Sequence, residues 1–278
     1  MSARVAVVTD STAYLPEGLA DDVRVVPLHV VLGGRTGAEG VDVSPHDVAD
    51  ALRERRVKVS TSRPTPAEFA AAYRASGASC LVSVHLSAEL SGTYDAAVLA
   101  AADVAADGIT VHVVDSRTIA MGLGFAVLAA ARAARDGADA AGVVVAAQAS
   151  DTDELFYVDT LEHLRRGGRI GAAAALLGAA LAVKPLLHVT AGRIAPLEKV
   201  RTASKALARM EDLAVLRAGD EPVDLAVHHL AAGEKAAALA TRLSARLPRL
   251  GALHVSEVGA VVGAHVGPGL LGVVIRRR

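Results

Sequence analysis

The strongest constraint on the fold of this chain is the alternation of short apolar segments with helical segments in its first half. Apolar runs at residues 5–10, 79–85 and 109–114 are separated by stretches with helical spacing, many of them rich in alanine. Strands that alternate with helices pair in parallel, because each helix returns the chain to the same edge of the sheet. We therefore predict an α/β fold whose N-terminal domain has a parallel sheet with helices on both faces.

The pattern changes at about residue 150. A short strand is expected at 155–158, and two extended segments at 185–190 and 193–200 flank an Ala-Gly turn that predicts a hairpin. Helices and strands then alternate to the last residues. We predict two domains, 1–150 and 151–278, of which the second is a mixed α/β domain.

The composition excludes several classes of function. Lysine plus arginine number 29, aspartate plus glutamate 30, and only 3% of residues are aromatic, so neither charge nor stacking favours a nucleic acid partner. The single cysteine, Cys80, rules out a disulfide framework and cysteine-rich zinc sites. His228 and His229 are adjacent and point to opposite faces of a strand, which makes a poor metal pair. We expect no metal and no cofactor.

The chain also lacks the signals of a membrane or secreted protein. Its longest uncharged apolar run, residues 170–183, is fourteen residues long, whereas a membrane span needs about 20. We expect a buried helix there. Residues 1–10 contain no long apolar segment of the kind found in signal peptides. These features predict a cytoplasmic protein with at most transient membrane contact.

Small polar residues form four clusters in the N-terminal half: Thr9–Thr12, Ser60–Ser62, Ser91–Thr93 and Asp115–Thr118. Three of them directly follow predicted strands, and the carboxyl ends of parallel strands form the crevice where such sheets bind ligands. Ser60–Ser62 and Ser91–Thr93 also precede helices, whose first amide groups attract anions. The same residue types are ordinary helix caps, and this local chemistry leaves phosphate and carboxylate both open.

A fifth cluster near the C-terminus contains the pattern GxGxxG at Gly267, Gly269 and Gly272. Only six residues follow it, which leaves no room for the helix and crossover of a dinucleotide site. We expect instead a tight glycine turn that presents His265 before a final strand. Neither a P-loop lysine motif nor the GxSxG motif of a nucleophile elbow occurs in the sequence.

Taken together and in order, these segments resemble the DegV family of fatty-acid-binding proteins, the lipid-presenting subunits of bacterial fatty acid kinase. The resemblance covers nearly the whole chain and runs through Val8–Thr12, Ser60–Ser62, Leu90–Tyr94, Val114–Ser116, Leu161–Ile170, Lys184-Pro185, Val200–Thr202 and His265–Gly269.

This resemblance implies two α/β domains that enclose an acyl chain in an apolar tunnel, with the carboxylate held by hydroxyl groups at the domain interface. The matching hydroxyl residues are Thr61 and Ser91, and His265 is expected close to the carboxylate. Their neighbours Ser62, Gly92 and Thr93 complete the two ligand-binding loops.

The resemblance also assigns Arg169 and Arg201 to positions near the headgroup or on the surface that faces the kinase. Arg63 departs from the family, which usually has Gln there, and it adds a positive charge near the expected headgroup. The implied partners are a long-chain fatty acid and the catalytic subunit of fatty acid kinase.

Two alternatives remain open at this stage. The first is a hydrolase or transferase acting on an acyl or phosphoester substrate, with His265 as base and Ser91 as nucleophile, although no third orienting group stands at a readable spacing. The second is a carrier of another amphipathic acid. We favour a non-catalytic lipid-binding protein and assign no catalytic residue.

Overall fold

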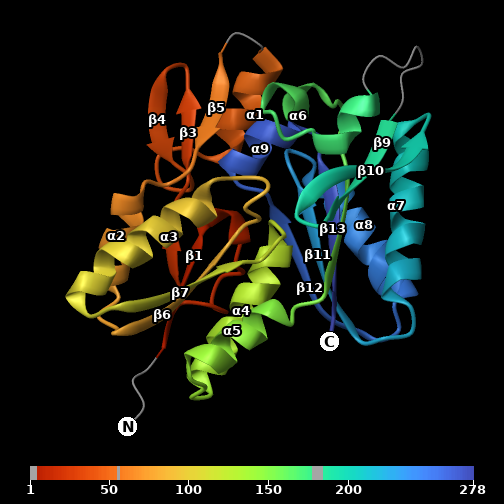
Figure 1. Cartoon of the computed structure of the whole chain (residues 1–278). Coiled ribbons are helices and arrows are strands. Elements are labelled where there is room, and N and C mark those ends of the chain that lie inside the picture. The colour runs from red at the N-terminus through yellow and green to blue at the C-terminus, as the bar shows by residue number, and fades with distance from the viewer. Residues whose placement is uncertain (1–4, 55–56, 177–183) are drawn as a thin grey trace. The chain divides into compact units, whose positions relative to one another are not determined.

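The computed structural model describes residues 5–54, 57–176 and 184–278. Their contacts divide the chain into two compact units (Figure 1). Unit 1 comprises Met1–His29 and Ser62–Ser150, and unit 2 comprises Val30–Thr61 and Asp151–Arg278. The break after residue 150 coincides with the predicted domain boundary, but residues 30–61 belong to unit 2.

The described residues of unit 1 form a four-stranded parallel sheet in the order β2-β1-β6-β7. Its strands are β1 (Ala6–Asp10), β2 (Arg24–Val26), β6 (Cys80–His85) and β7 (Thr110–Asp115). The helical segments are η1 (Ser11–Ala13), α2 (Pro66–Ala75), α3 (Thr93–Val104), η2 (Ala105–Asp107), α4 (Met121–Arg135) and α5 (Ala140–Gln148). The parallel α/β prediction is confirmed.

Both faces of this sheet are covered. Val7 and Val8 point to opposite faces, and both are buried. The Val8 face packs against Phe69 of α2 and Ala97 of α3, while α4 and α5 pack against β1, β6 and β7. Small residues such as alanine let these helices approach closely, which suits a chain in which aromatic residues are rare.

The described part of unit 2 contains a six-stranded mixed sheet in the order β10-β9-β8-β13-β11-β12. Its strands are β8 (Thr152–Tyr157), β9 (Lys184–Thr190), β10 (Arg193–Val200), β11 (Val223–His229), β12 (Leu250–Glu257) and β13 (Leu271–Arg277). Only the β11–β12 pair is parallel among these described strands. Helices α7 (Ala203–Ala218) and α8 (Gly233–Arg246) pack on this sheet through an apolar core. The predicted mixed α/β character of this part of the chain and its β9–β10 hairpin are confirmed.

Residues 30–61 supply a second, small sheet to unit 2. Strands β4 (Arg35–Ala38), β3 (His29–Leu32) and β5 (Val59–Ser62) form it in that order, and α1 (Pro45–Glu54) lies between β4 and β5 in the chain. Helix α1 packs against α9 (Ala260–Val266), which is more than 200 residues away in the sequence. Contacts at this separation leave no trace in local sequence patterns.

Two hydrogen bonds fix this segment to α9. Glu39 is buried, and its Oε1 accepts the Val261 amide proton at 2.8 Å. Thr61 Oγ1 lies 2.8 Å from His265 Nε2. Between them, Gly263 of α9 leaves room for the side chains of Leu230 and Val48, which lie 3.2 and 3.8 Å from where a Cβ would stand.

The apolar run at 170–183 is only partly described. Residues Gly171–Leu176 form the 3-10 segment η3, which follows the short helix α6 (Glu162–Arg166), and residues 177–183 lie outside the described part. No described helix has both the length and the apolar character needed to cross a membrane.

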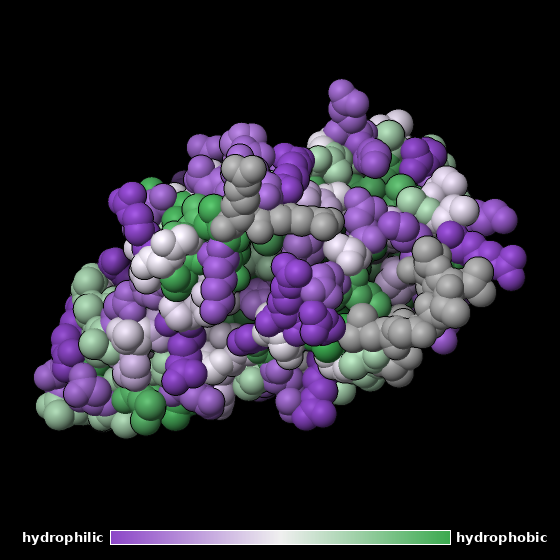
Figure 2. Space-filling model, turned by 90° about the horizontal axis from the view of Figure 1, so that it is seen from above, coloured by the Kyte–Doolittle hydropathy of each residue, from purple (hydrophilic) through white to green (hydrophobic). Residues whose placement is uncertain are grey.

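Hydrophilic residues cover much of the face shown in Figure 2, with apolar residues between them.

Replacing Glu39 with Ala should test how strongly the segment 30–61 is anchored. The variant leaves the buried Val261 N–H without this acceptor, so the free energy of unfolding should fall by about 1–3 kcal/mol. Urea denaturation followed by circular dichroism measures the change. Glu17→Ala, at an exposed position, is the control and should change stability by less than about 0.5 kcal/mol. Equal, small effects of the two substitutions would contradict the anchoring role.

Candidate functional site

The order of the strands in unit 1 marks the edge of the sheet where a ligand crevice is expected. In the sheet order β2-β1-β6, the chain leaves β1 toward β2 on one side and later adds β6 on the other. Parallel sheets bind ligands at such switch points, outside the carboxyl ends of the strands. Strand β1 ends at Asp10 and β6 ends at His85, so the loops that follow these two residues border the crevice.

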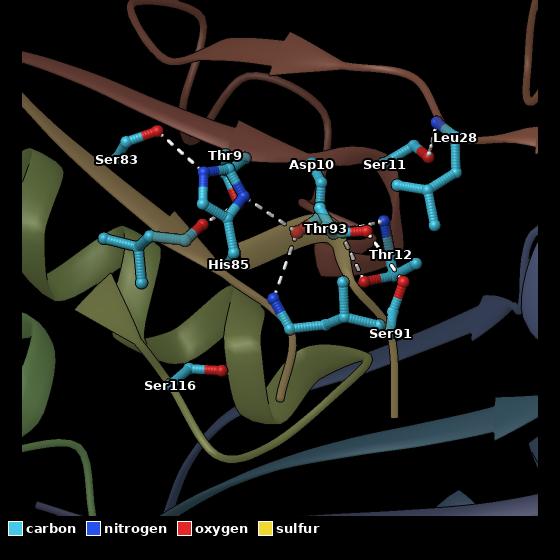
Figure 3. Close-up of polar contacts among 12 residues, drawn as sticks. Thr9, Asp10, Ser11, Thr12, Leu28, Ser83, His85, Ser91, Thr93 and Ser116 are labelled. Carbon is cyan, nitrogen blue, oxygen red and sulfur yellow. Dashed lines mark hydrogen bonds and ion pairs between the residues drawn. The ribbon is translucent and has the colours of Figure 1, made fainter. Parts of the chain in front are cut away.

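Asp10 ties these two loops together (Figure 3). Its carboxylate is fully buried and accepts hydrogen bonds from Thr12 N at 3.0 Å, Thr12 Oγ1 at 2.6 Å and Leu86 N at 3.0 Å. His85 Nδ1, also 3.0 Å away, completes the set. A buried carboxylate needs such donors to offset its lost hydration, so the two loops cannot separate without exposing or stranding this charge.

The same anchor continues into the core. Ser83 Oγ lies 2.7 Å from His85 Nε2 and accepts a hydrogen bond from the Tyr73 hydroxyl at 2.9 Å. Burial raises the pKa of Tyr73 to about 12, which keeps its phenol protonated as a donor. Ser83, His85 and Asp10 follow one another as in a catalytic triad, but all three are fully buried. No substrate reaches such a serine, and the arrangement is structural.

The loop from Leu86 to Gly92 leads to the hydroxyl groups of Ser91 and Thr93. Its backbone is held where Ser87 N donates to Thr118 O at 2.9 Å and Ser91 N donates to Ser87 O at 3.2 Å. Ser91 Oγ and Thr93 Oγ1 lie 2.8 Å apart (Figure 3). The structure therefore brings Ser91 and Thr93 together at the start of α3.

The N-terminus of α3 is open. Gly92 occupies the N-cap position, and no described side chain caps the first amides of this helix. Arg63 lies beside this helix start. A Cβ added to Gly92 would stand only 2.5 Å from Arg63 Nη1. Helix amides and a guanidinium next to two hydroxyls make an environment that favours an anion.

The prediction that Ser60–Ser62 lies at a helix start with amides free to bind an anion is wrong. Helix α2 begins at Pro66 with Thr65 as N-cap, and Thr65 Oγ1 accepts the Glu68 amide proton while the Glu68 carboxylate accepts that of Thr65. This capping box satisfies the amides that were expected to bind an anion. Thr61 and the exposed Ser62 end β5 instead, and the division between the units falls between them.

Thr61 belongs to a polar cluster within unit 2. Its partner His265 lies on α9, not in the glycine turn that the sequence suggested, and Gly267 ends that helix with φ of +76°. Arg169 Nη1 donates to Gly167 O at 2.6 Å, and Gly167 packs directly against His265 Nδ1, where any Cβ would collide. Thr61, His265 and Arg169 are therefore brought together.

The electrostatics of this cluster keep the imidazole neutral. Burial, and secondarily the charge of Arg169, lowers the pKa of His265 from 6.5 to about 4. At neutral pH the ring therefore carries a single proton, and a positive charge lies close to it. The cluster therefore combines two neutral hydrogen-bonding groups, the Thr61 hydroxyl and the His265 imidazole, with the positive charge of Arg169 nearby.

Arg201 is exposed just after β10 and next to Thr202, the N-cap of α7. Its predicted place near the headgroup stays a prediction, as does the sharing of one ligand by Thr61 and Ser91.

Across residues 5–54, 57–176 and 184–278, no group of three or more His, Cys, Asp or Glu side chains is arranged to hold a metal ion.

The sequence did not single out His85, and Gly167 entered only as part of the Leu161–Ile170 segment that carries the resemblance, with no role assigned to it. His85 could have been found as a histidine that ends a predicted strand directly before a polar loop, facing Asp10 at the end of another. Gly167 gave no such signal, because its backbone φ is ordinary and only its contact with His265 requires glycine.

Comparison with known proteins agrees with this architecture. Residues 4–278 match the family model described as uncharacterised protein, DegV family. The DegV domain-containing protein SCO2569 of Streptomyces coelicolor is 59% identical over the full length of both chains. The chain therefore belongs to the DegV family.

Solved structures show the same fold. A fatty-acid-binding DegV family protein from Thermus thermophilus superposes with a TM-score of 0.91 at 33% identity, covering 99% of this chain and 100% of that one. DegV of Bacillus subtilis, described as a fatty acid binding protein, gives 0.90 at 34% identity over 100% of both.

Gly167→Ala tests the packing of the His265 cluster. The new methyl group collides with the imidazole, so we expect the hydrogen bond to Thr61 to break and the free energy of unfolding to fall by about 1–3 kcal/mol. Gly233→Ala is the matched control, since its Cβ would lie 3.7 Å from the nearest described atoms and should cost less than about 0.5 kcal/mol. Wild-type stability of Gly167→Ala in urea denaturation would show that the imidazole can move away freely.

Proposed function

We propose that this protein binds a long-chain fatty acid and presents its carboxylate to a partner kinase for acyl-phosphate formation. The observation that carries the proposal is the character of the two polar sites: each offers a hydroxyl donor, Thr61 or Ser91, beside a positive group. Solved relatives that share the fold are described as fatty-acid-binding proteins, which supports the same ligand class here.

The chemistry suits a carboxylate that must later react. A carboxylate taken out of water needs hydrogen bonds, which the hydroxyls of Thr61 and Ser91 and the open amides of α3 can donate. Neutral donors hold the headgroup without a bidentate arginine pair, so an oxygen stays available to attack a phosphoryl group. The acyl chain contributes about 0.8 kcal/mol for each methylene it buries.

The geometry favours a carrier over an enzyme. A hydrolase of the kind considered above needs Ser91 activated by His265, but Ser91 Oγ is paired with Thr93 and His265 Nε2 with Thr61. Nucleophilic catalysis requires the base within hydrogen-bond reach of its nucleophile. We propose a protein without chemistry of its own that acts in the cytoplasm, where the ATP used by its kinase is present.

The headgroup assignment predicts the behaviour of a double variant. Thr61→Val with Ser91→Ala removes two donors to a charged group, each worth about 1.5–3 kcal/mol, so the Kd for a long-chain fatty acid should rise at least about 100-fold. Isothermal titration calorimetry on delipidated protein measures it.

The matched control is Thr241→Val with Ser244→Ala, the same chemical changes at two exposed positions of α8. It should bind as the wild type does. Native mass spectrometry of the purified wild type should show a bound mass of a few hundred daltons. If the delipidated wild type binds no fatty acid, the proposed function is wrong. If the wild type binds fatty acid and the double variant binds it with the same Kd, the assignment of Thr61 and Ser91 to the headgroup is wrong.

The partner proposal makes a separate prediction for Arg201. Arg201→Ala should slow ATP-dependent acyl-phosphate formation by the kinase catalytic subunit about tenfold, as expected for one lost charge-assisted contact, while the Kd for fatty acid stays within about twofold. Arg132→Ala, which changes a largely exposed arginine of α4, should affect neither quantity. An unchanged rate would remove Arg201 from the kinase-facing surface.

A further inference from the structure

The side chain of Arg63 lies across the backbone of Gly92. A Cβ built on Gly92 would stand 2.5 Å from Arg63 Nη1 and 3.1 Å from both Cδ and Cζ of that arginine. The guanidinium therefore occupies the space that any side chain at position 92 would need. Gly92 has an ordinary φ of −73°, so its backbone conformation does not require glycine, whereas the contact with Arg63 does. Both residues belong to unit 1.

No counterion within the described part of the chain explains why Arg63 lies there. Its guanidinium forms no ion pair with, and donates no hydrogen bond to, any of residues 5–54, 57–176 and 184–278. Asp95, in the first turn of α3, is exposed and is not paired with it. Gly92 is the N-cap of α3, and the partial positive charge at the N-terminal end of a helix disfavours a neighbouring cation. An anion bound next to Arg63 would remove this repulsion.

The neighbouring hydroxyl groups indicate which anion fits. Ser91 Oγ and Thr93 Oγ1, which flank Gly92 in the chain, lie 2.8 Å apart (Figure 3), in the site proposed above for the fatty acid carboxylate. A carboxylate has two oxygens, and in the proposed complex the hydroxyls of Thr61 and Ser91 donate to them. A phosphoryl group offers three acceptor oxygens and carries about −1.5 to −2 charge at neutral pH, so it has oxygens left for the planar fork of an arginine.

We propose that Arg63, from its place against Gly92, recognises the phosphoryl group of an acyl phosphate and makes this protein bind that product more tightly than the free acid. The inference rests on the proposed function, because it concerns the product formed at the same site. Arg63 is exposed, so water screens its long-range attraction for a single charge. Discrimination therefore depends on direct, charge-assisted hydrogen bonds to phosphoryl oxygens. Phosphorylation by the partner kinase would then strengthen binding instead of releasing the product.

A comparison of two ligands tests this specificity. Palmitate supplies a carboxylate and hexadecyl phosphate a stable phosphoryl headgroup, and isothermal titration calorimetry on the delipidated protein gives a Kd for each. The wild type should prefer hexadecyl phosphate by about tenfold or more, and Arg63→Gln should lower this preference about tenfold, as expected for one lost charge-assisted contact. The difference between the two alkyl chains cancels, because every variant meets the same two ligands. Arg132→Gln, at a largely exposed arginine of α4, removes the same charge elsewhere in unit 1 and should keep the wild-type preference.

Gly92→Ala tests the contact itself while the arginine is still present. Its methyl group would displace the guanidinium, so this variant should lose the phosphoryl preference as Arg63→Gln does, and the double variant should lose no more than either single one. Gly233→Ala, at the start of α8, is the matched control, since the nearest described atoms would lie 3.7 Å from its Cβ. The proposal is overturned if Arg63→Gln or Gly92→Ala keeps the wild-type preference.

The same titrations separate this inference from the proposed function. A wild type that binds palmitate but shows no preference dependent on Arg63 would leave fatty acid binding standing and reject the role of Arg63. A wild type that binds hexadecyl phosphate through Arg63 but does not bind palmitate would reject the proposed function and leave phosphoryl recognition standing. Both are rejected if the wild type binds neither ligand.

Discussion

The buried carboxylate of Asp10 is the interaction on which the two loops at the strand ends of unit 1 depend. An ionised carboxylate has about four acceptor positions, and described residues donate four hydrogen bonds to this one, two from Thr12 and one each from His85 and Leu86. These donors come from the ends of two adjacent strands. The negative charge can remain buried only while both loops keep their places, so its desolvation enforces the shape of the loop that leads to Ser91.

Unit 2 uses the same principle with a different acid. Glu39 is buried and accepts the Val261 amide proton, which fixes α9 against a segment that is 222 residues away in the chain. Four residues further along α9, His265 meets Thr61. In each unit a buried acid therefore accepts a backbone amide proton close to a hydroxyl-bearing element, so interactions within the unit set the hydroxyl positions.

Local periodicity predicted most of the elements but not their long-range partners. Strand and helix alternation gave the parallel sheet, and Gly192 marked the β9–β10 hairpin. Helix α5 was not predicted, because Gly142 and three consecutive valines from Val143 have poor helix propensity; burial of Val143 and a cap from Asp139 stabilise it nevertheless. The α9 helix was taken for a glycine turn, since its seven residues are small or β-branched except for His265. The Thr65–Glu68 capping box, which distinguishes the closed helix start of α2 from the one at Gly92, was not recognised in the sequence, although both of its residues stand there at the capping-box spacing.

The two hydroxyl sites differ in what surrounds them, and this difference bears on how a carboxylate is held. Near Thr61, a neutral imidazole stands between the hydroxyl and Gly167, whose carbonyl accepts a hydrogen bond from Arg169. Near Ser91, the corresponding charge is Arg63, which is exposed and therefore strongly screened by water. In the proposed complex, several modest hydrogen bonds would stabilise the carboxylate, and the loss of those at one oxygen would be tolerable when a phosphoryl group is transferred to that oxygen.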